Sequence, residues 1–357
     1  MTTSRLDRLR ASLEQRGLDA IVINKPHNRF YLSGFTGTAG VLLITGKSAY
    51  LITDFRYTEQ AAAQAPHFTV LRPESTNYAL LARLLEQEQV QRIGIEGDYL
   101  SVDEHTTYRE TFGQREMLSA TGLVEALRLV KDEQEQQLMR RAAAIADEAW
   151  AQIIPLIKPG VVERDLALEL EYRMKRLGAE ALSFDIIVAS GVRSALPHGR
   201  ASEKVIEAGD LVTFDFGCIY RGYCSDMTRT VMVGEPTPKQ REIYEIVLEA
   251  QLRGVAACRA GITGRELDEA CRGYIREKGY GDAFGHGTGH GVGIEIHEGP
   301  RASFRSEGEI LQPGMIVTIE PGIYLPGWGG VRIEDMVLVT ETGCESFSTS
   351  PKELLIL

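Results

Sequence analysis

The sequence predicts two domains, an α/β domain at the N-terminus followed by a larger α+β domain. The chain has 357 residues, whereas a single domain usually holds about 100 to 200. Short apolar runs alternate with helical patterns in the first part of the chain, and beyond it helices and apolar hairpins come in blocks. We therefore expect an α/β domain over residues 1–127 and an α+β domain over residues 128–357.

The N-terminal part shows buried strands separated by amphipathic helices. Leu6, Leu9 and Leu13 share one face of a helix that Gly17 ends. Another helical pattern covers residues 78–88. The apolar runs expected to form strands are residues 20–23, 41–44, 49–52, 68–71 and 92–95. This alternation is typical of an α/β domain.

The C-terminal part begins with two helices and continues with hairpins. Apolar residues recur at helical spacing from Leu138 to Ile153, where Pro155 ends the pattern, and again from Leu166 to Leu177. Two further helical patterns lie between the strand-like segments. Those segments are residues 184–190, 211–233, 314–324 and 330–340. Such blocks are typical of an α+β domain.

Charge and cysteine content exclude several classes of protein. The net charge is −11, which argues against a nucleic-acid or anionic-membrane surface, since those need clustered positive charge. Five cysteines without a CxxC spacing suggest neither a disulfide framework nor a zinc knuckle. No apolar stretch is long enough to span a bilayer, and no secretory signal is visible at the N-terminus. A cytoplasmic location is therefore expected.

Two pairs of acidic residues lie in strongly apolar strands. A hairpin turning about Tyr220 and Arg221 would place Asp215 directly opposite Asp226. A loop centred near Gly327 would likewise place Glu320 opposite Glu334. A single pair could be a solvated edge, but burying four carboxylates without compensation is strongly disfavoured. One or two divalent cations would neutralise them.

A glycine-rich segment, FGHGTGHGVGIEIHE, supplies the fifth candidate ligand, His290. Its alternating glycines make a helix improbable and indicate a close backbone approach instead. One imidazole and four carboxylates suit Mn²⁺, Co²⁺ or Zn²⁺ in a paired site, with Mn²⁺ preferred. Two cations sharing a hydroxide would provide a nucleophile at neutral pH, so the expected chemistry is metal-assisted hydrolysis.

The order of these motifs resembles a known family. The series DFG, SDMTRT, HGTGHGVG, EPGIY and VRIED resembles the metallopeptidases with the pita-bread fold, which include methionine aminopeptidase, Xaa-Pro aminopeptidase and Xaa-Pro dipeptidase (prolidase). The segments NRFYLSGFTGTAG and ITDFRYTEQA resemble the creatinase/prolidase N-terminal domain, which methionine aminopeptidases lack. The resemblance therefore implies the proline-specific branch, which hydrolyses the bond between an N-terminal residue and proline.

The resemblance also implies individual roles. Asp215 would bind one metal ion, Asp226 and Glu334 would bridge two, and His290 and Glu320 would hold the other. Glu320 would also act as general base. Among the remaining candidates, His198 and His297 would contact the substrate, and Arg301 would bind the proline carboxylate. Arg332, His286 and Thr228 would lie behind the metal ligands.

Three readings of the sequence stay open at this point. The first is an Xaa-Pro peptidase acting on short proline-containing peptides, as a dipeptidase or an aminopeptidase. The second is a creatinase-like amidinohydrolase, and the third is a non-catalytic pita-bread domain that binds peptides. A homodimer is expected from the resemblance, with the YLSGF segment of one subunit near the site of the other.

Overall fold

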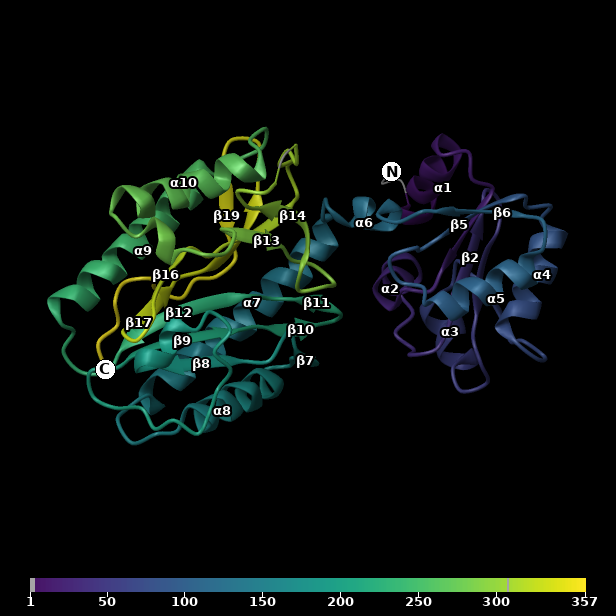
Figure 1. The fold of residues 1–357 in the computed structure, drawn as a ribbon. Coiled ribbons are helices and arrows are strands. Elements are labelled where there is room, and N and C mark those ends of the chain that lie inside the picture. The colour runs from purple at the N-terminus through teal and green to yellow at the C-terminus, as the bar shows by residue number, and fades with distance from the viewer. Residues whose placement is uncertain (1–3, 307) are drawn as a thin grey trace. The chain divides into compact units, whose positions relative to one another are not determined.

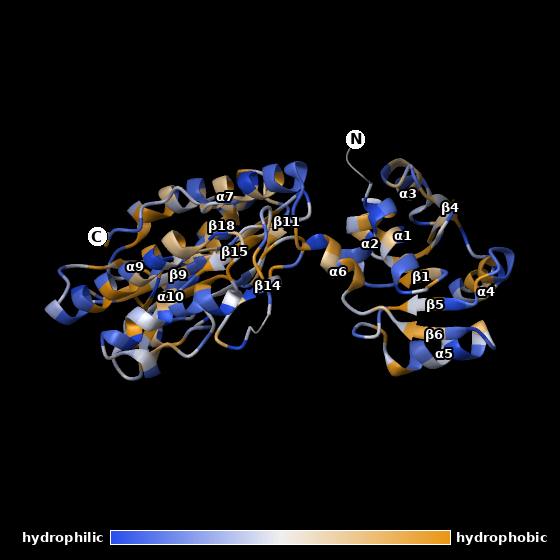
Figure 2. Ribbon diagram, turned by 90° about the horizontal axis from the view of Figure 1, so that it is seen from above, coloured by the Kyte–Doolittle hydropathy of each residue, from blue (hydrophilic) through white to orange (hydrophobic). Residues whose placement is uncertain are grey.

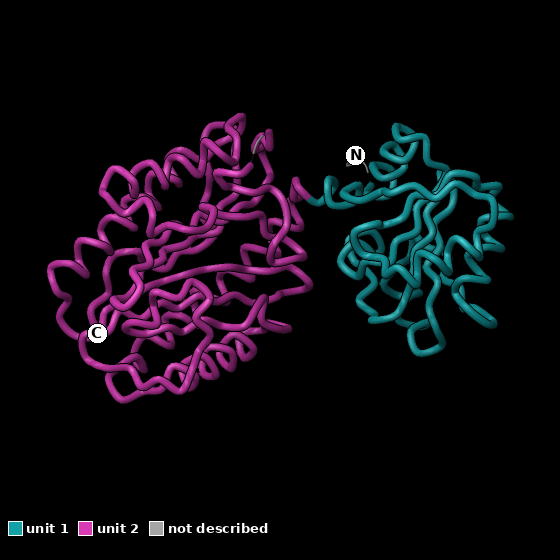
Figure 3. Tube along the Cα trace, viewed as in Figure 1, with its two compact units in different colours: residues 1–128 teal, residues 129–357 magenta. Residues whose placement is uncertain are grey.

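The computed structural model describes residues 4–306 and 308–357. The chain forms two compact units, residues 1–128 and residues 129–357 (Figures 1 and 3). Each unit has its own sheets and hydrophobic core, so each is described by itself. In the described ranges, every helix is too short or too polar to cross a lipid bilayer.

The N-terminal unit is built on one six-stranded mixed sheet in the order β4-β3-β2-β1-β5-β6. The central strand β1 pairs antiparallel with β2 and parallel with β5. The strands are β1 (Ala20–Ile23), β2 (Val41–Thr45), β3 (Ala49–Ile52), β4 (Thr69–Leu71), β5 (Arg92–Ile95) and β6 (Glu116–Ser119). The helices are α1 (Arg5–Gln15), α2 (Pro26–Ser33), α3 (Thr58–Gln64), α4 (Asn77–Gln87), α5 (Val102–Phe112) and α6 (Leu123–Arg128). The predicted α/β class is confirmed.

The C-terminal unit combines four long helices with short, mostly antiparallel strands, which confirms the α+β prediction. Its helices are α7 (Glu133–Ile153), α8 (Glu163–Arg176), α9 (Pro238–Ala257) and α10 (Gly264–Glu277), with 3-10 turns η1 (Ile154–Leu156), η2 (Gly191–Ala195) and η3 (Gly281–Ala283). Its first strands are β7 (Ala181–Leu182), β8 (Ile187–Ser190), β9 (Leu211–Phe216), β10 (Cys218–Tyr220), β11 (Tyr223–Cys224) and β12 (Met227–Met232). The later strands are β13 (Gly289–Gly291), β14 (Glu298–Ala302), β15 (Ile316–Ile319), β16 (Gly322–Leu325), β17 (Gly329–Arg332), β18 (Asp335–Val339) and β19 (Cys344–Ser346).

Two separate cores divide the C-terminal unit into halves. In one, α7 and α8 pack on β8, β9 and β12, with Trp150 against the rings of Phe214 and Phe216. In the other, α9 and α10 pack on β15 to β18. The colouring of Figure 2 shows polar and apolar stretches alternating along α7, as expected for a helix with one buried face. The helices thus cover one face of the strands in each half.

The hairpin that carries Asp215 and Asp226 differs from its predicted register. Strand β9 pairs with β12 so that Asp215 faces Thr228, and the predicted direct pairing of Asp215 with Asp226 is wrong. Arg221 and Gly222 form the turn, both with positive φ (47° and 80°), as a two-residue hairpin turn requires. The turn centre therefore moves by one residue, and Asp226 becomes a diagonal neighbour of Asp215.

The second acidic hairpin has the predicted register. Strand β15 pairs with β18, where Ile319 faces Asp335. Strand β16 pairs with β17, where Gly322 faces Arg332. Both ladders share one register, so Glu320 and Glu334 lie opposite one another in the gap between them.

Candidate metal centre

A cavity of about 690 Å³ in the C-terminal unit collects nearly all the side chains that the sequence singles out. The five candidate metal ligands line it: Asp215, Asp226, His290, Glu320 and Glu334. So do the other candidates except Thr228, namely His198, His286, His297, Arg301 and Arg332. Residues far apart in the sequence therefore converge on one space, from both halves of the unit.

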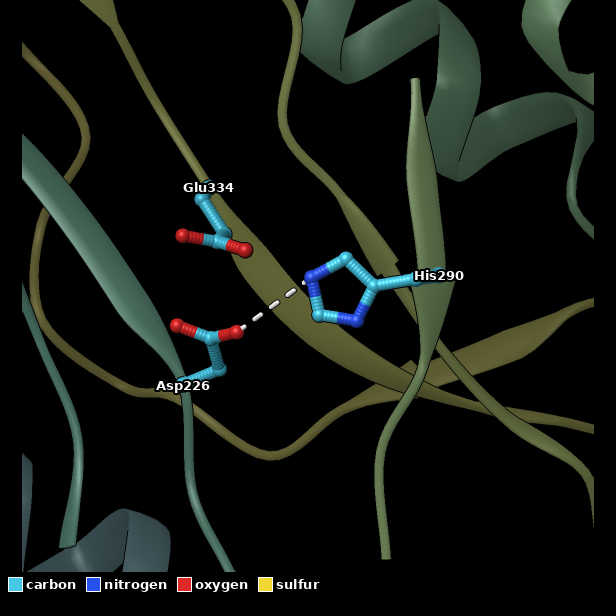
Figure 4. Close-up of side chains that lie close together, drawn as sticks. All are labelled: Asp226, His290 and Glu334. Carbon is cyan, nitrogen blue, oxygen red and sulfur yellow. Dashed lines mark ion pairs between the residues drawn. The ribbon is translucent and has the colours of Figure 1, made fainter. Parts of the chain in front are cut away.

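Three of the candidate ligands form a tight cluster. Asp226, His290 and Glu334 each offer one ligand atom, and these atoms all lie within 4.8 Å of one another. Figure 4 shows the three side chains pointing toward a common space from three separate segments. Glu320 is adjacent, with its Oε1 3.3 Å from His290 Nε2. Asp215 lines the same cavity but lies outside this cluster.

Glycines on both sides of His290 let β13 approach its neighbours closely. A Cβ at Gly289 would lie 1.8 Å from the carbonyl oxygen of Thr318, and one at Gly291 would lie 1.9 Å from that of Gly299. Any side chain at either position would force the strands apart. The close backbone approach predicted for this segment is thus present, and it carries the imidazole to the carboxylates.

The contacts of His290 leave a site suited to a cation. Its Nδ1 donates to the carbonyl oxygen of Gly291 (3.1 Å), so in the neutral ring Nε2 carries a lone pair. That nitrogen lies 3.6 Å from Asp226 Oδ2 and 3.3 Å from Glu320 Oε1. Burial lowers the pKa of His290 to about 4, which favours the neutral ring. A lone pair facing carboxylate oxygens is repulsive unless a cation lies between them, and this donor set fits one.

The carboxylates themselves are destabilised by their surroundings. Burial raises the pKa of Asp226 well above its ordinary value, and the charges of Glu334 and Asp215 raise it further. Burial also raises the pKa of Glu334, with Glu320 adding to the effect. The pKa of Glu320 is raised to about 8, again chiefly by burial. Bound divalent cations would reverse these shifts, because they stabilise the charged form.

Asp215 is held by an arginine on one side only. Arg332 Nη2 donates to Asp215 Oδ2 (2.7 Å), whereas Asp215 Oδ1 is buried without a hydrogen-bond partner. A buried carboxylate oxygen without a partner is costly. Because Asp215 lines the cavity, this oxygen is available as a ligand for a cation.

Arg332 connects Asp215 to a residue that sequence reasoning missed, Tyr324. The Tyr324 hydroxyl accepts from Arg332 Nη1 (3.0 Å) and contacts His286 Nε2 (2.8 Å). His286 Nδ1 donates to the carbonyl oxygen of Gly287 (2.8 Å), so Tyr324 donates to Nε2. Tyr324 lies four positions after Glu320 in the same hairpin, so the two-residue strand period could have indicated it.

Thr228 lies behind Glu334, opposite the cavity. Its hydroxyl donates to Glu334 Oε2 (2.7 Å) and accepts from Arg332 Nε (3.2 Å). Its carbonyl oxygen also accepts from the Glu334 N–H (3.1 Å). Both Thr228 and Glu334 are buried. These contacts orient one Glu334 oxygen away from the cavity and leave the other for it.

The candidate substrate residues surround this cluster. The ring of His297 stands edge-on to that of His290, with centroids 4.3 Å apart, and partial desolvation lowers the pKa of His297. Arg301 pairs with His290 across β13 and β14, and its side chain is exposed. His198 is also exposed and lies on the segment after η2. The three side chains thus lie around the cavity without being buried in it.

Comparisons with known proteins agree with this site. Residues 137–341 match metallopeptidase family M24, and residues 5–130 match the creatinase/prolidase N-terminal domain. The chain is 43% identical to the Xaa-Pro dipeptidase of Pyrococcus furiosus, over 98% of this chain and 99% of the relative.

Two solved structures are similar along almost the whole chain. An Xaa-Pro dipeptidase from Bacillus anthracis has a TM-score of 0.97 and 52% identity, covering 99% of both chains. An X-Pro aminopeptidase from Thermotoga maritima has a TM-score of 0.91 and 40% identity, covering 97% of this chain and 100% of that one. The two domains of this chain, the second with the pita-bread fold and its carboxylate and histidine cluster, therefore identify it as a member of metallopeptidase family M24.

Proposed function

We propose that this protein is an Xaa-Pro peptidase that hydrolyses the bond between an N-terminal residue and proline with the help of two divalent cations. The convergence of Asp226, His290 and Glu334 to within 4.8 Å is the observation that carries the proposal. Relatives that cover nearly the whole chain are named Xaa-Pro dipeptidase and X-Pro aminopeptidase. An amidinohydrolase or a pure binding domain would not need this ligand set.

The four carboxylates and one imidazole of the cavity would hold the cations. Four negative charges would balance two dications, and the resemblance to the family implies that Asp226 and Glu334 would contact both. The bound cations would polarise the scissile carbonyl and lower the pKa of a water molecule. Manganese is the metal we propose, although the same donors also suit cobalt and zinc.

The surrounding residues would bind the peptide and move protons. Glu320, held by the Thr318 hydroxyl at 3.2 Å, would take a proton from the attacking water as general base. His297 would donate a hydrogen bond to the developing oxyanion. His198 would face the proline side of the bond. Because the Xaa-Pro nitrogen carries no hydrogen, contacts to the carbonyl and to the ring replace the usual N–H contact.

Replacing His297 with alanine is expected to lower kcat for Ala-Pro by about a hundredfold or more, as loss of one oxyanion donor typically does. The cation content should stay unchanged, since the Nε2 atom that faces the carboxylates belongs to His290. Steady-state kinetics together with elemental analysis measure both quantities. Loss of the cations in this variant would contradict the assigned role.

A dipeptide is the substrate we propose to be preferred. Arg301 lines the cavity next to His290, where its guanidinium could pair with the proline carboxylate of a dipeptide. Ala-Pro should therefore be hydrolysed faster than Ala-Pro-Ala, and the Arg301→Ala variant should lose this preference. Faster hydrolysis of Ala-Pro-Ala would instead assign the protein as an aminopeptidase, and hydrolysis of neither peptide would refute the proposed function.

A homodimer and a cytoplasmic location complete the proposal. Both derive from the sequence and its resemblance to the family. Analytical ultracentrifugation of the purified protein tests the dimer, and a monomer would refute it. Fractionation of the native cells tests the location.

A further inference from the structure

Glu163 carries a buried carboxylate that the proposed catalytic steps do not use. It begins α8 and is 0% exposed. Its Oε1 accepts the N–H and the hydroxyl of Ser190 (2.7 and 2.8 Å). Its Oε2 accepts the N–H and the hydroxyl of Ser202 (3.1 and 2.7 Å) and a further hydrogen bond from Arg193 Nη1. Both oxygens of this buried carboxylate are therefore fully hydrogen-bonded, and removing one of them would leave donors without a partner.

These hydrogen bonds close a loop at both of its ends. Ser190 is the last residue of β8, and Ser202 lies beyond the cavity-lining part of the segment. Arg193 also reaches across the loop, since its Nη2 donates to the carbonyl oxygen of Arg200 (2.8 Å). Glu163 and Arg193 together tie the start of the loop to its end.

The loop carries His198 to the cavity. Pro197, His198 and Arg200 all line the cavity. His198 is exposed, so its own packing does not fix the imidazole, and the loop backbone determines where it lies. The loop also contacts the hairpin that carries Glu320 and Glu334, where the Pro197 carbonyl oxygen accepts from Arg332 Nη1 (3.1 Å). Arg332 at the cavity and Glu163 at the loop ends thus both help to fix the position of His198, together with the Gly330 N–H, which donates to the Ser194 hydroxyl (2.8 Å).

We propose that Glu163 is a positioning residue, which holds the 190–202 loop so that His198 meets the proline side of the substrate. This inference rests on the proposed function, because it assigns His198 a substrate contact. Misplacing a group by about 1 Å can cost about a hundredfold in rate. The network that Glu163 forms therefore has a measurable catalytic consequence without any contact between Glu163 and the substrate.

The test is a double-mutant cycle between Glu163→Gln and His198→Ala. Glutamine keeps one acceptor oxygen but turns an amide toward donors and leaves Arg193 without its ion pair. We expect Glu163→Gln to lower kcat/KM for Ala-Pro by about ten- to a hundredfold, mainly in kcat, with unchanged cation content. In the His198→Ala background the same substitution should have almost no further effect.

A matched control is available elsewhere in the same unit. Asp147 is likewise a carboxylate that fixes a loop, since it accepts from the N–H groups of Thr349 and Ser350 (2.7 and 3.0 Å). None of these three residues lines the cavity. Asp147→Asn should lower the midpoint of thermal unfolding and leave kcat/KM unchanged.

Several outcomes would overturn the inference. They are wild-type kinetics in Glu163→Gln, or equal losses from this substitution with and without His198. If Glu163→Gln does not fold, Ser202→Ala removes a single hydroxyl from the network, and the same cycle with His198→Ala applies to it. A wild-type protein that does not hydrolyse Ala-Pro would refute the proposed function itself, which is a different result.

Discussion

Replacing Glu334 with glutamine is expected to lower kcat for Ala-Pro by more than about a hundredfold and to release at least one cation. Substitutions behind a metal ligand typically cost about ten- to a hundredfold, and Glu334 lies in the ligand cluster itself. Glutamine preserves size and can still accept from Thr228, so the lost charge is the main change. Kinetics and elemental analysis of the purified variant measure the two effects.

The neighbouring acid provides the control. Asp335 is also buried, but its oxygens accept from Arg229 and Lys352 (both 2.7 Å). Burial alone would raise the pKa of Asp335, yet the two cationic side chains outweigh it and hold the pKa below its ordinary value. Asp335→Asn should therefore destabilise the fold without changing the cation content. Full activity and full cation content in Glu334→Gln would show that the assignment of Glu334 is wrong.

Removing the cations by exhaustive chelation is expected to abolish hydrolysis and to lower the midpoint of thermal unfolding by about 5 to 10 °C. The physical reason is the repulsion among the buried Asp226 and Glu334 and the half-buried Glu320, which bound cations would relieve. Adding Mn²⁺ back should restore both properties, with a midpoint that rises with the Mn²⁺ concentration.

Differential scanning fluorimetry over a metal titration measures this dependence. Glu334→Gln is again informative, because the cation-free variant has one charge fewer to repel its neighbours. Its midpoint should respond less to Mn²⁺ than that of the wild type. If the fully chelated wild-type protein still hydrolysed Ala-Pro, the proposal that hydrolysis requires cations bound in the cavity would be wrong.

The two acidic hairpins show which parts of the site a sequence can predict. The register of Glu320 and Glu334 follows from a loop that is symmetric about Gly327 and from strands without a bulge. The register of Asp215 and Asp226 does not, because Arg221 itself adopts a positive φ of 47°. Positive φ is uncommon for residues other than glycine, so residue preferences placed the turn one position too early.

Contacts between distant segments lie beyond such patterns. Glu163 looks like any acidic residue in the first turn of a helix. Its partners are Ser190, at the end of β8, and Ser202, in the loop that follows. Only the packing of α8 against β8 brings them together. The unpaired oxygen of Asp215 is likewise a property of the fold, since it depends on where Arg332 reaches.

The division of the C-terminal unit into two cores affects how the candidate metal ligands are held in position. Asp215 and Asp226 belong to the hairpin that packs on α7 and α8, whereas Glu320 and Glu334 belong to the hairpin that packs on α9 and α10. A pair of ions bound by residues of both hairpins would hold the two halves of the unit together. Mutations inside either core, far from the bound peptide, should therefore lower activity by changing the distance between the two hairpins.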